Sequence, residues 1–275
     1  MRTTTRHSRT MKTTALVFVA LGALGASLPA SAQSAPAPAE AASAPTSDWA
    51  FTANLGLFSD YRFRGISQTN MKPALQGGFD LGHSSGFYVG NWNSNIDSAQ
   101  YNGANLEMDF YGGYKHSFES GLGIDGGVYY YYYPGSGTNP AGSSSIDNTE
   151  LYIAGSYGPL TLKYNYAVSN FFSAPNSKGS SYTDLGFVYD FGNNWGIVAH
   201  YGYQYLKGAA VVTQINGTSA NNISDWKLGG TYTIDGWVIG LAYIATNRDL
   251  TYGTAALTNK NISGATGVLS VAKTF

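Results

Sequence analysis

Charged side chains recur at every second position in several segments of this chain. Asp60, Arg62 and Arg64 follow one another at this spacing, and Glu107 and Asp109 repeat it. Residues two apart in a β-strand point to the same face of a sheet, so this spacing would line one face with fixed charge. Around an aqueous passage, such charges bias which ions and solutes pass. The candidates for this lining are Asp60, Arg62, Arg64, Glu107, Asp109, Lys115, Lys163 and Lys227.

Catalytic and metal-binding patterns are sparse. His83 and Ser85 form the only His-x-Ser pair in the sequence, and this pair falls in a predicted short turn. A barrel enzyme such as a phospholipase would need Ser and His together on a lipid-facing wall. His116 is expected to point outward near the rim of the short turns, and His200 to point inward. The sequence therefore predicts no enzyme, no metal and no cofactor.

β-strands would hold the charged side chains. Residues 49–64 show the pattern most clearly, with apolar side chains at most odd positions and polar ones at most even positions. The same alternation predicts eleven further strands. Their expected ranges are 73–82, 87–95, 105–118, 122–133, 148–157, 160–169, 181–191, 195–206, 224–235, 237–246 and 265–275. Twelve is an even number, as in bacterial single-chain barrels.

The connections between these strands alternate strictly in length. Five are short and lie near 83–86, 119–121, 158–159, 192–194 and 235–236. Six are longer and polar and lie near 65–72, 96–104, 134–147, 170–180, 207–223 and 247–264. This arrangement is typical of barrels with short periplasmic turns at one rim and long extracellular loops at the other. It places both ends of the barrel at the periplasmic rim.

The composition indicates a membrane wall built from strands. Only 11% of the 275 residues are charged, whereas soluble domains carry about 25%, and 15% are aromatic. No apolar run approaches the roughly 20 residues of a membrane-spanning helix. The fold class predicted is all-β, a transmembrane up-and-down antiparallel barrel with twelve strands. The net charge of −1 gives no indication of nucleic-acid binding.

The N-terminal region indicates export. Residues 1–32 have a basic start, a short apolar core and the small residues Ala30-Ser31-Ala32, which predict a signal peptide. Met11 is an alternative start. Residues 33–47 are rich in Ala and Pro and predict a flexible linker, and residues 48–275 form the expected barrel. We therefore expect passage through the periplasm and residence in the bacterial outer membrane, in contact with its lipids.

Aromatic residues are expected to mark the two membrane interfaces. Trp49, Trp195 and Trp237 lie beside predicted short turns, while Trp92 and Trp226 lie toward the long loops. All five are expected in two outer girdles. In the run 129–133, alternation places Tyr130 and Tyr132 outside and the three remaining tyrosines inside. The inner tyrosines are expected to fill the barrel, with a slide for sugars as the alternative.

Several motifs resemble the TorF family of outer-membrane porins. They are Ser59-Asp60-Tyr61-Arg62-Phe63-Arg64-Gly65-Ile66-Ser67-Gln68-Thr69, Lys72-Pro73-Ala74, Gly86-Phe87-Tyr88-Val89-Gly90-Asn91-Trp92, Ser94-Asn95, Tyr129–Pro134 and Val271-Ala272-Lys273-Thr274-Phe275. The resemblance spans residues 49–275 and implies an outer-membrane channel, without catalytic residues. The terminal Phe275 is similar to the aromatic residue by which the barrel-assembly machinery recognises its clients. Lys273 departs from the apolar residue usual at its position.

The function expected is passive diffusion of small hydrophilic solutes or ions. Ten acids and five bases are expected to face inward, which favours a mild preference for cations. These residues are Asp60, Asp80, Glu107, Asp109, Asp125, Glu150, Asp184, Asp190, Asp225, Asp235, Arg62, Arg64, Lys115, Lys163 and Lys227. Arg62 and Arg64 are the first candidates for a constriction. A plugged structural or adhesive barrel is the main alternative, ahead of a barrel enzyme.

Overall fold

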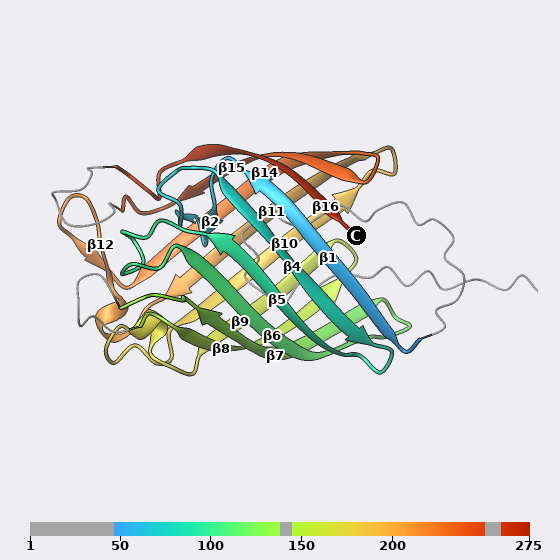
Figure 1. The fold of residues 1–275 in the computed structure, drawn as a ribbon, viewed down its shortest axis with the longest axis horizontal. Helices are drawn as coiled ribbons and strands as arrows, with labels where there is room; N and C mark the ends of the chain where they lie inside the picture. The colour runs from blue at the N-terminus through green and yellow to red at the C-terminus, as the bar shows by residue number, and fades with distance from the viewer. Residues whose placement is uncertain (1–46, 138–144, 251–259) are drawn as a thin grey trace, which may run out of the picture.

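Twelve antiparallel strands close into one barrel, as the sequence predicts (Figure 1). The computed structural model describes residues 47–137, 145–250 and 260–275. The predicted signal peptide (1–32) and the linker up to residue 46 lie outside the described residues. In the described part, no helix is long and apolar enough to span a membrane.

The strands follow one another around the barrel, and β1 pairs with both β4 and β16. Because lipid offers no hydrogen bonds to a strand edge, this closure is what a membrane wall requires. The wall strands are β1 (Trp49–Phe58), β4 (Ala74–His83), β5 (Phe87–Asn95), β6 (Leu106–Ser117), β7 (Leu122–Tyr132), β8 (Asn148–Tyr157), β9 (Leu160–Ala167), β10 (Ser181–Asp190), β11 (Trp195–Tyr205), β14 (Asn222–Ile234), β15 (Trp237–Thr246) and β16 (Thr266–Thr274).

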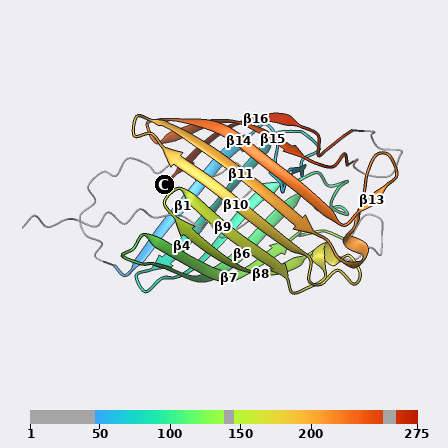
Figure 2. The same ribbon diagram turned by 180° about the vertical axis from the view of Figure 1, so that it is seen from behind.

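Short turns gather at one rim and long connections at the other, which Figure 2 shows from the opposite side. The long connections carry the remaining elements. These are the hairpin of β2 (Arg62–Phe63) and β3 (Ile66–Ser67), the 3₁₀ turns η1 (Phe171–Ser173) and η2 (Gly208–Ala210), and the hairpin of β12 (Val212–Thr213) and β13 (Ser219–Ala220). Hereafter the two ends of the barrel are called the turn rim and the loop rim.

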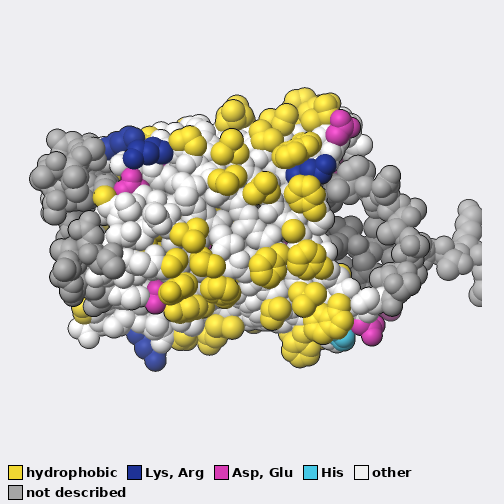
Figure 3. Space-filling view, in the orientation of Figure 1, with side chains coloured by type: hydrophobic (Ala, Val, Ile, Leu, Met, Phe, Trp, Pro, Cys, Tyr) yellow, Lys and Arg dark blue, Asp and Glu magenta, His cyan; other side chains and the backbone are white. Residues whose placement is uncertain are grey.

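Side chains alternate between the outer wall and the interior along each strand. On β6, Asp109 is 2% exposed and points inward, while the next residue, Phe110, is 44% exposed and points outward. Figure 3 shows apolar side chains spread over the barrel wall, with charged ones near its two ends. This distribution confirms the predicted strand faces and gives a surface suited to lipid.

Four of the five tryptophans lie on the outer wall. Trp49, Trp195, Trp226 and Trp237 are exposed there, as the sequence predicts. The prediction for Trp92 was wrong, because its side chain is buried inside the barrel and packs edge-on against Tyr61, with ring centroids 5.4 Å apart. Trp92 shares the inner face of β5 with Tyr88, so its position in the alternation outweighs the preference of indole for the interface.

Inward tyrosines lie across inward glycines of neighbouring strands. A Cβ at Gly202 of β11 would collide with the hydroxyl of Tyr182 and lie 2.6 Å from Asp225 Oδ1. A Cβ at Gly113 would lie 2.8 Å from the Tyr88 hydroxyl. Glycine therefore makes room in the wall for large side chains that would otherwise not fit within a twelve-stranded barrel.

Candidate functional site

The first long connection folds into the barrel as a β-hairpin. Residues Asp60–Thr69, called the lumen hairpin below, are almost all buried. Arg64 and Gly65 form its turn with φ angles of 48° and 79°, and two successive positive φ angles are typical of tight two-residue hairpins. The sequence-based prediction that residues 59–64 continue the first strand was wrong, because β1 ends at Phe58. The charged side chains still lie inside the barrel.

Asp60 organises the base of the lumen hairpin. Its carboxylate accepts hydrogen bonds from Arg62 Nε at 2.5 Å, Ser67 Oγ at 2.6 Å and Thr69 Oγ1 at 3.1 Å. One buried acid thus connects both arms of the hairpin. Charge-assisted bonds of this kind are stronger than neutral ones, so the hairpin has its own internal support.

Arg62 fastens the lumen hairpin to the last long connection. Its Nη1 donates to the backbone oxygens of Ile262 at 2.8 Å and Gly264 at 3.2 Å, in the loop before β16. The same nitrogen donates to Gly65 O at 3.0 Å. Arg62 is fully buried. These carbonyl partners, together with Asp60, offset part of its loss of water, while its Nη2 has no hydrogen-bond partner among the described residues.

Arg64 extends from the tip of the hairpin to the far wall. Its Nη2 lies 2.7 Å from Glu150 Oε2 on β8, and its Nη1 donates to Gln204 Oε1 on β11. Counted around the barrel from β1, β8 is the fifth strand in one direction and β11 the fourth in the other. One guanidinium therefore contacts both sides of the wall opposite β1, and the hairpin crosses the bore.

The Arg64–Glu150 pair is buried and supported by aromatic rings. The guanidinium carbon lies 4.3 Å from the ring centroid of Tyr182 and 5.7 Å from that of Phe171. Burial acts to lower the pKa of Arg64, but the Glu150 carboxylate outweighs this effect and raises that pKa above its ordinary value. The Arg64 guanidinium therefore keeps its positive charge.

Acids on β4, β6 and β7 are bonded to tyrosines. The hydroxyl of Tyr133 donates to Glu107 at 2.8 Å, and that of Tyr129 donates to Asp109 at 2.9 Å. Toward the turn rim, Tyr111 donates to Asp80 and Tyr88 to Asp125, at 2.7 and 2.6 Å. Tyr129, Tyr131 and Tyr133 are each at most 2% exposed, so they pack the interior, as expected of barrel filling.

The lysines among the predicted lining residues also lie on the inner face. Lys115 Nζ is 5.4 Å from the Tyr88 ring centroid, and Lys163 Nζ is 4.3 Å from that of Tyr152. Lys163 and Lys227 are 4% and 6% exposed. All eight predicted lining residues thus lie on the interior side, and the structure brings Asp60 and Arg62 into direct contact.

The partners of Arg64 were not among the predicted lining residues. Glu150, one of the ten predicted inward acids, pairs with it, while Gln204 and Tyr182 complete its surroundings. His200 is also bonded to two acids, at 2.7 Å to Asp184 and 2.5 Å to Asp225. The alternation of side chains along the strands could have indicated that each of these residues points inward. It could not have indicated which of them contact the lumen hairpin.

The histidines of the enzyme alternative are dispersed. His83 Nδ1 lies 2.7 Å from Ser85 Oγ, but His83 is the last residue of β4 and Ser85 lies in the exposed turn that follows it. His116 is exposed and packs edge-on against Phe118. The Ser and His side chains of the turn therefore lie at the turn rim, away from the loop rim where a lipase acting on the outer leaflet would need them.

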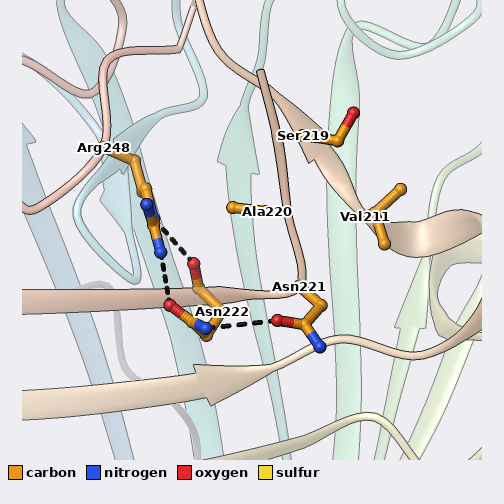
Figure 4. Close-up of a pocket in the computed structure, with 6 residues that line it drawn as sticks. All are labelled: Val211, Ser219, Ala220, Asn221, Asn222 and Arg248. Carbon is orange, nitrogen blue, oxygen red and sulfur yellow. Dashed lines mark hydrogen bonds between the residues drawn. The ribbon is translucent and has the colours of Figure 1, made fainter.

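A pocket of about 360 Å³ opens among the loops at the loop rim (Figure 4). Arg248 donates from Nε to Asn222 O at 3.0 Å and from Nη2 to Asn222 Oδ1 at 2.5 Å. The Arg248 guanidinium is thus bonded to Asn222, which also lines the pocket. The residues that line the pocket are Val211, Ser219, Ala220, Asn221, Asn222 and Arg248.

The sequence match identifies the family. Residues 42–275 match the family model described as a bacterial protein of unknown function (Gcw_chp). The chain belongs to the Gcw_chp family. The match covers every strand of this Gcw_chp barrel, while the name TorF stays a prediction from motif resemblance. No curated protein matches the chain.

Two solved porins are similar to the Gcw_chp barrel in fold. The KdgM porin has 10% sequence identity and a TM-score of 0.50, and the match covers 82% of this chain and 98% of that chain. The NanC porin, in its rhombohedral crystal form, has 9% identity and a TM-score of 0.52, with 82% and 99% covered. The closed antiparallel barrel is therefore the fold of known porins.

Proposed function

We propose that this protein is an outer-membrane pore through which small hydrophilic solutes or ions diffuse passively. The observation that carries the proposal is the combination of an apolar outer wall, a charged interior and a hairpin that narrows the bore. Passage through such a bore depends on its width and on the fixed charges that line it.

The lumen hairpin is the proposed constriction. Arg62 fixes its base and Arg64 its tip, so these two residues determine how much of the cross-section stays filled. Asp60, Glu107, Asp109, Lys115, Lys163 and Lys227 supply further charge on the interior side. The mild cation preference expected from the sequence count of ten inward acids and five bases is a separate prediction about the same lining. One of those acids, Asp235, lies in the exposed turn after β14 and not on the inner face.

The proposed location is the outer membrane, reached through the periplasm by means of the predicted signal peptide. The expected partners are lipids on the outer wall, small solutes in the bore and the barrel-assembly machinery, through the strand that ends at Phe275. Exposed apolar residues on the wall strands support the lipid contact. For the His83–Ser85 pair we propose no catalytic role, because it lies in an exposed turn at the turn rim.

A plugged structural barrel is the second candidate. The near-complete burial of the lumen hairpin and of Arg62 favours it, since a bore filled along its length would not conduct. Conductance therefore distinguishes the two candidates more directly than structure does.

The test is single-channel recording of refolded protein in planar bilayers. A pore gives discrete current steps that scale with salt concentration, and the Arg62→Ala plus Arg64→Ala variant changes its reversal potential in a salt gradient. Silent bilayers, with folded protein confirmed in them, would contradict the pore and support the plugged barrel. Release of fatty acids from the lipid would instead support an enzyme.

A further inference from the structure

Two lysines on the inner wall form no ion pair within the described part of the chain. Lys163 of β9 and Lys227 of β14 are 4% and 6% exposed. Among the described residues, no carboxylate oxygen lies within 4.0 Å of either ammonium group, and Lys163 Nζ has no hydrogen-bond acceptor. A buried ammonium without a counter-charge is costly. An anion bound beside either lysine would supply that counter-charge.

The neighbouring acids are already engaged. Asp184 pairs in register with Lys163, and Asp225 is the adjacent inward residue to Lys227 on β14. Both carboxylates bond to His200, at 2.7 and 2.5 Å. Because only the imidazolium has N–H on both ring nitrogens, a His200 that donates to both acids is itself a cation.

The acids nearest the two lysines are all bonded to other groups. Asp125 accepts from the Tyr88 hydroxyl at 2.6 Å, and Asp184 and Asp225 are bonded to His200. Glu150 is held by Arg64, so it does not neutralise either lysine. Within the residues that the structure describes, neither lysine therefore has a carboxylate in direct contact with it.

Space lies between them. Gly186 of β10 pairs with Thr161 of β9 and with His200 of β11, and His200 pairs with Lys227. A Cβ at Gly186 would meet nothing nearer than Thr161 O, at 3.9 Å. Lys163 follows Thr161 by two residues on the same face. The wall thus carries a small open patch flanked by two long, flexible lysine stems.

We propose that Lys163 and Lys227 form a binding station for an oxyanion, the carboxylate or phosphate group of a small solute, over Gly186. The inference rests on the proposed function, because the solute reaches this patch through the bore. It specifies the substrate class as anionic, against the cation preference that formal charge counting predicts. Its position is next to the tip of the lumen hairpin, where Gly65 approaches Asp225.

The test measures anion binding through thermal unfolding, so it does not require the protein to conduct ions. Refolded protein in detergent is titrated with inorganic phosphate, and separately with acetate, while its thermal unfolding midpoint is recorded. Bound anion raises the midpoint. Lys163→Gln plus Lys227→Gln should increase the half-saturating concentration by about tenfold or more, since two charged hydrogen bonds are lost. Neutralising these lysines also removes their desolvation cost, so the variant is expected to fold.

The matched control is Lys178→Gln plus Lys207→Gln, which removes the same charge from exposed lysines of the long connections. It should bind as the unmodified protein does. No midpoint change with either anion, or an equal loss in both double variants, would overturn the station. A response to one anion alone identifies the source of the oxyanion. A silent bilayer experiment would contradict only the proposed function.

In conducting protein, the same variants give a second readout. Phosphate should reduce the chloride current of the unmodified protein, and this block should weaken by about tenfold in the Lys163→Gln plus Lys227→Gln variant. The reversal potential of that variant should move toward cation selectivity. An unchanged block in the variant would count against the station.

Discussion

Arg64 shows how one side chain can connect a loop to a distant wall. It is a buried charge whose partners Glu150 and Gln204 come from two strands on the far side of the barrel. The energetic consequence is asymmetric, because a pair that is satisfied costs little, whereas a single buried carboxylate left behind costs much.

Replacing Arg64 by Ala should therefore destabilise the fold by about 3–5 kcal/mol, because Glu150 remains buried without its partner. Adding Glu150→Gln should restore most of this loss, since no buried charge is left. Urea unfolding of the refolded protein measures both. Equal stability of the single and double variants would show that Glu150 is not stressed by the loss of Arg64.

The inward glycines make a second prediction at this scale. Gly202→Ala places a methyl group against the Tyr182 hydroxyl and 2.6 Å from Asp225 Oδ1, and such overpacking costs about 1–3 kcal/mol. Gly186→Ala is the matched control, since its Cβ would meet only Thr161 O, at an ordinary contact distance of 3.9 Å. The free energy of unfolding should fall for the first variant and change little for the second. A larger loss at Gly186 would contradict this account of the packing.

The strands of the wall were predictable, because an apolar exterior and a polar interior impose a period of two on every one of them. β5, β8 and β15 have the predicted bounds of 87–95, 148–157 and 237–246, and the other predicted bounds lie within two residues of the observed ones, apart from the end of the first strand. The stretch 59–64 was placed wrongly because the hairpin β2–β3 continues the same alternation. The chain leaves the wall at residues 59–61 and reverses at the Arg64–Gly65 turn. One Gly beside a polar loop is a weak signal of this change.

Contacts across the bore could not be predicted. Periodicity tells which side chains point inward, as it does for Glu150 and Gln204, but their distance from Arg64 depends on how a loop folds inside a closed wall. Trp92 is a different case, since its place in the alternation with Tyr88 indicated the interior. The general preference of tryptophan for membrane interfaces was given more weight than this alternation, which indicated the correct side.

Removing the lumen hairpin tests the constriction at the scale of one element. A short glycine link in place of residues 62–67 should raise single-channel conductance, because the segment that crosses the bore is gone. Shortening the β12–β13 hairpin (212–220) is the control, since that hairpin lies at the loop rim. The constriction is excluded if both deletions change conductance equally.

The whole molecule depends on one junction between strands that are distant in sequence. β1 pairs with β16 from Asn54–Thr274 to Phe58–Ser270. Phe275 extends this pairing, since its N–H donates to Ala53 O at 2.8 Å and its carbonyl accepts from Ala53 N–H at 3.1 Å. The last residue thus adds two backbone hydrogen bonds to the closure.

Deleting Phe275 should reduce the fraction of protein that folds in lipid vesicles, because those bonds are lost. Phe275→Ala retains both backbone groups and should fold unaided as the unmodified protein does. In cells, the alanine variant separates the proposed recognition of the Phe275 ring by the assembly machinery from barrel closure itself. Unaided folding that is equally impaired in both variants would show that the ring, and not the backbone, completes the barrel.

Arg62 strengthens the junction of the first and last strands at the loop rim, the end opposite Phe275. By holding the carbonyls of Ile262 and Gly264, it ties the first loop to the last, about 200 residues away in sequence. The first and last strands of the barrel are thereby joined at both rims, and the backbone hydrogen bonds of the β1–β16 pairing lie between these two junctions. Mechanical unfolding should therefore begin at a strand pair other than β1–β16. Across the described residues of both strands, the same pairing leaves no lateral opening between β1 and β16 through which an apolar solute could leave the bore.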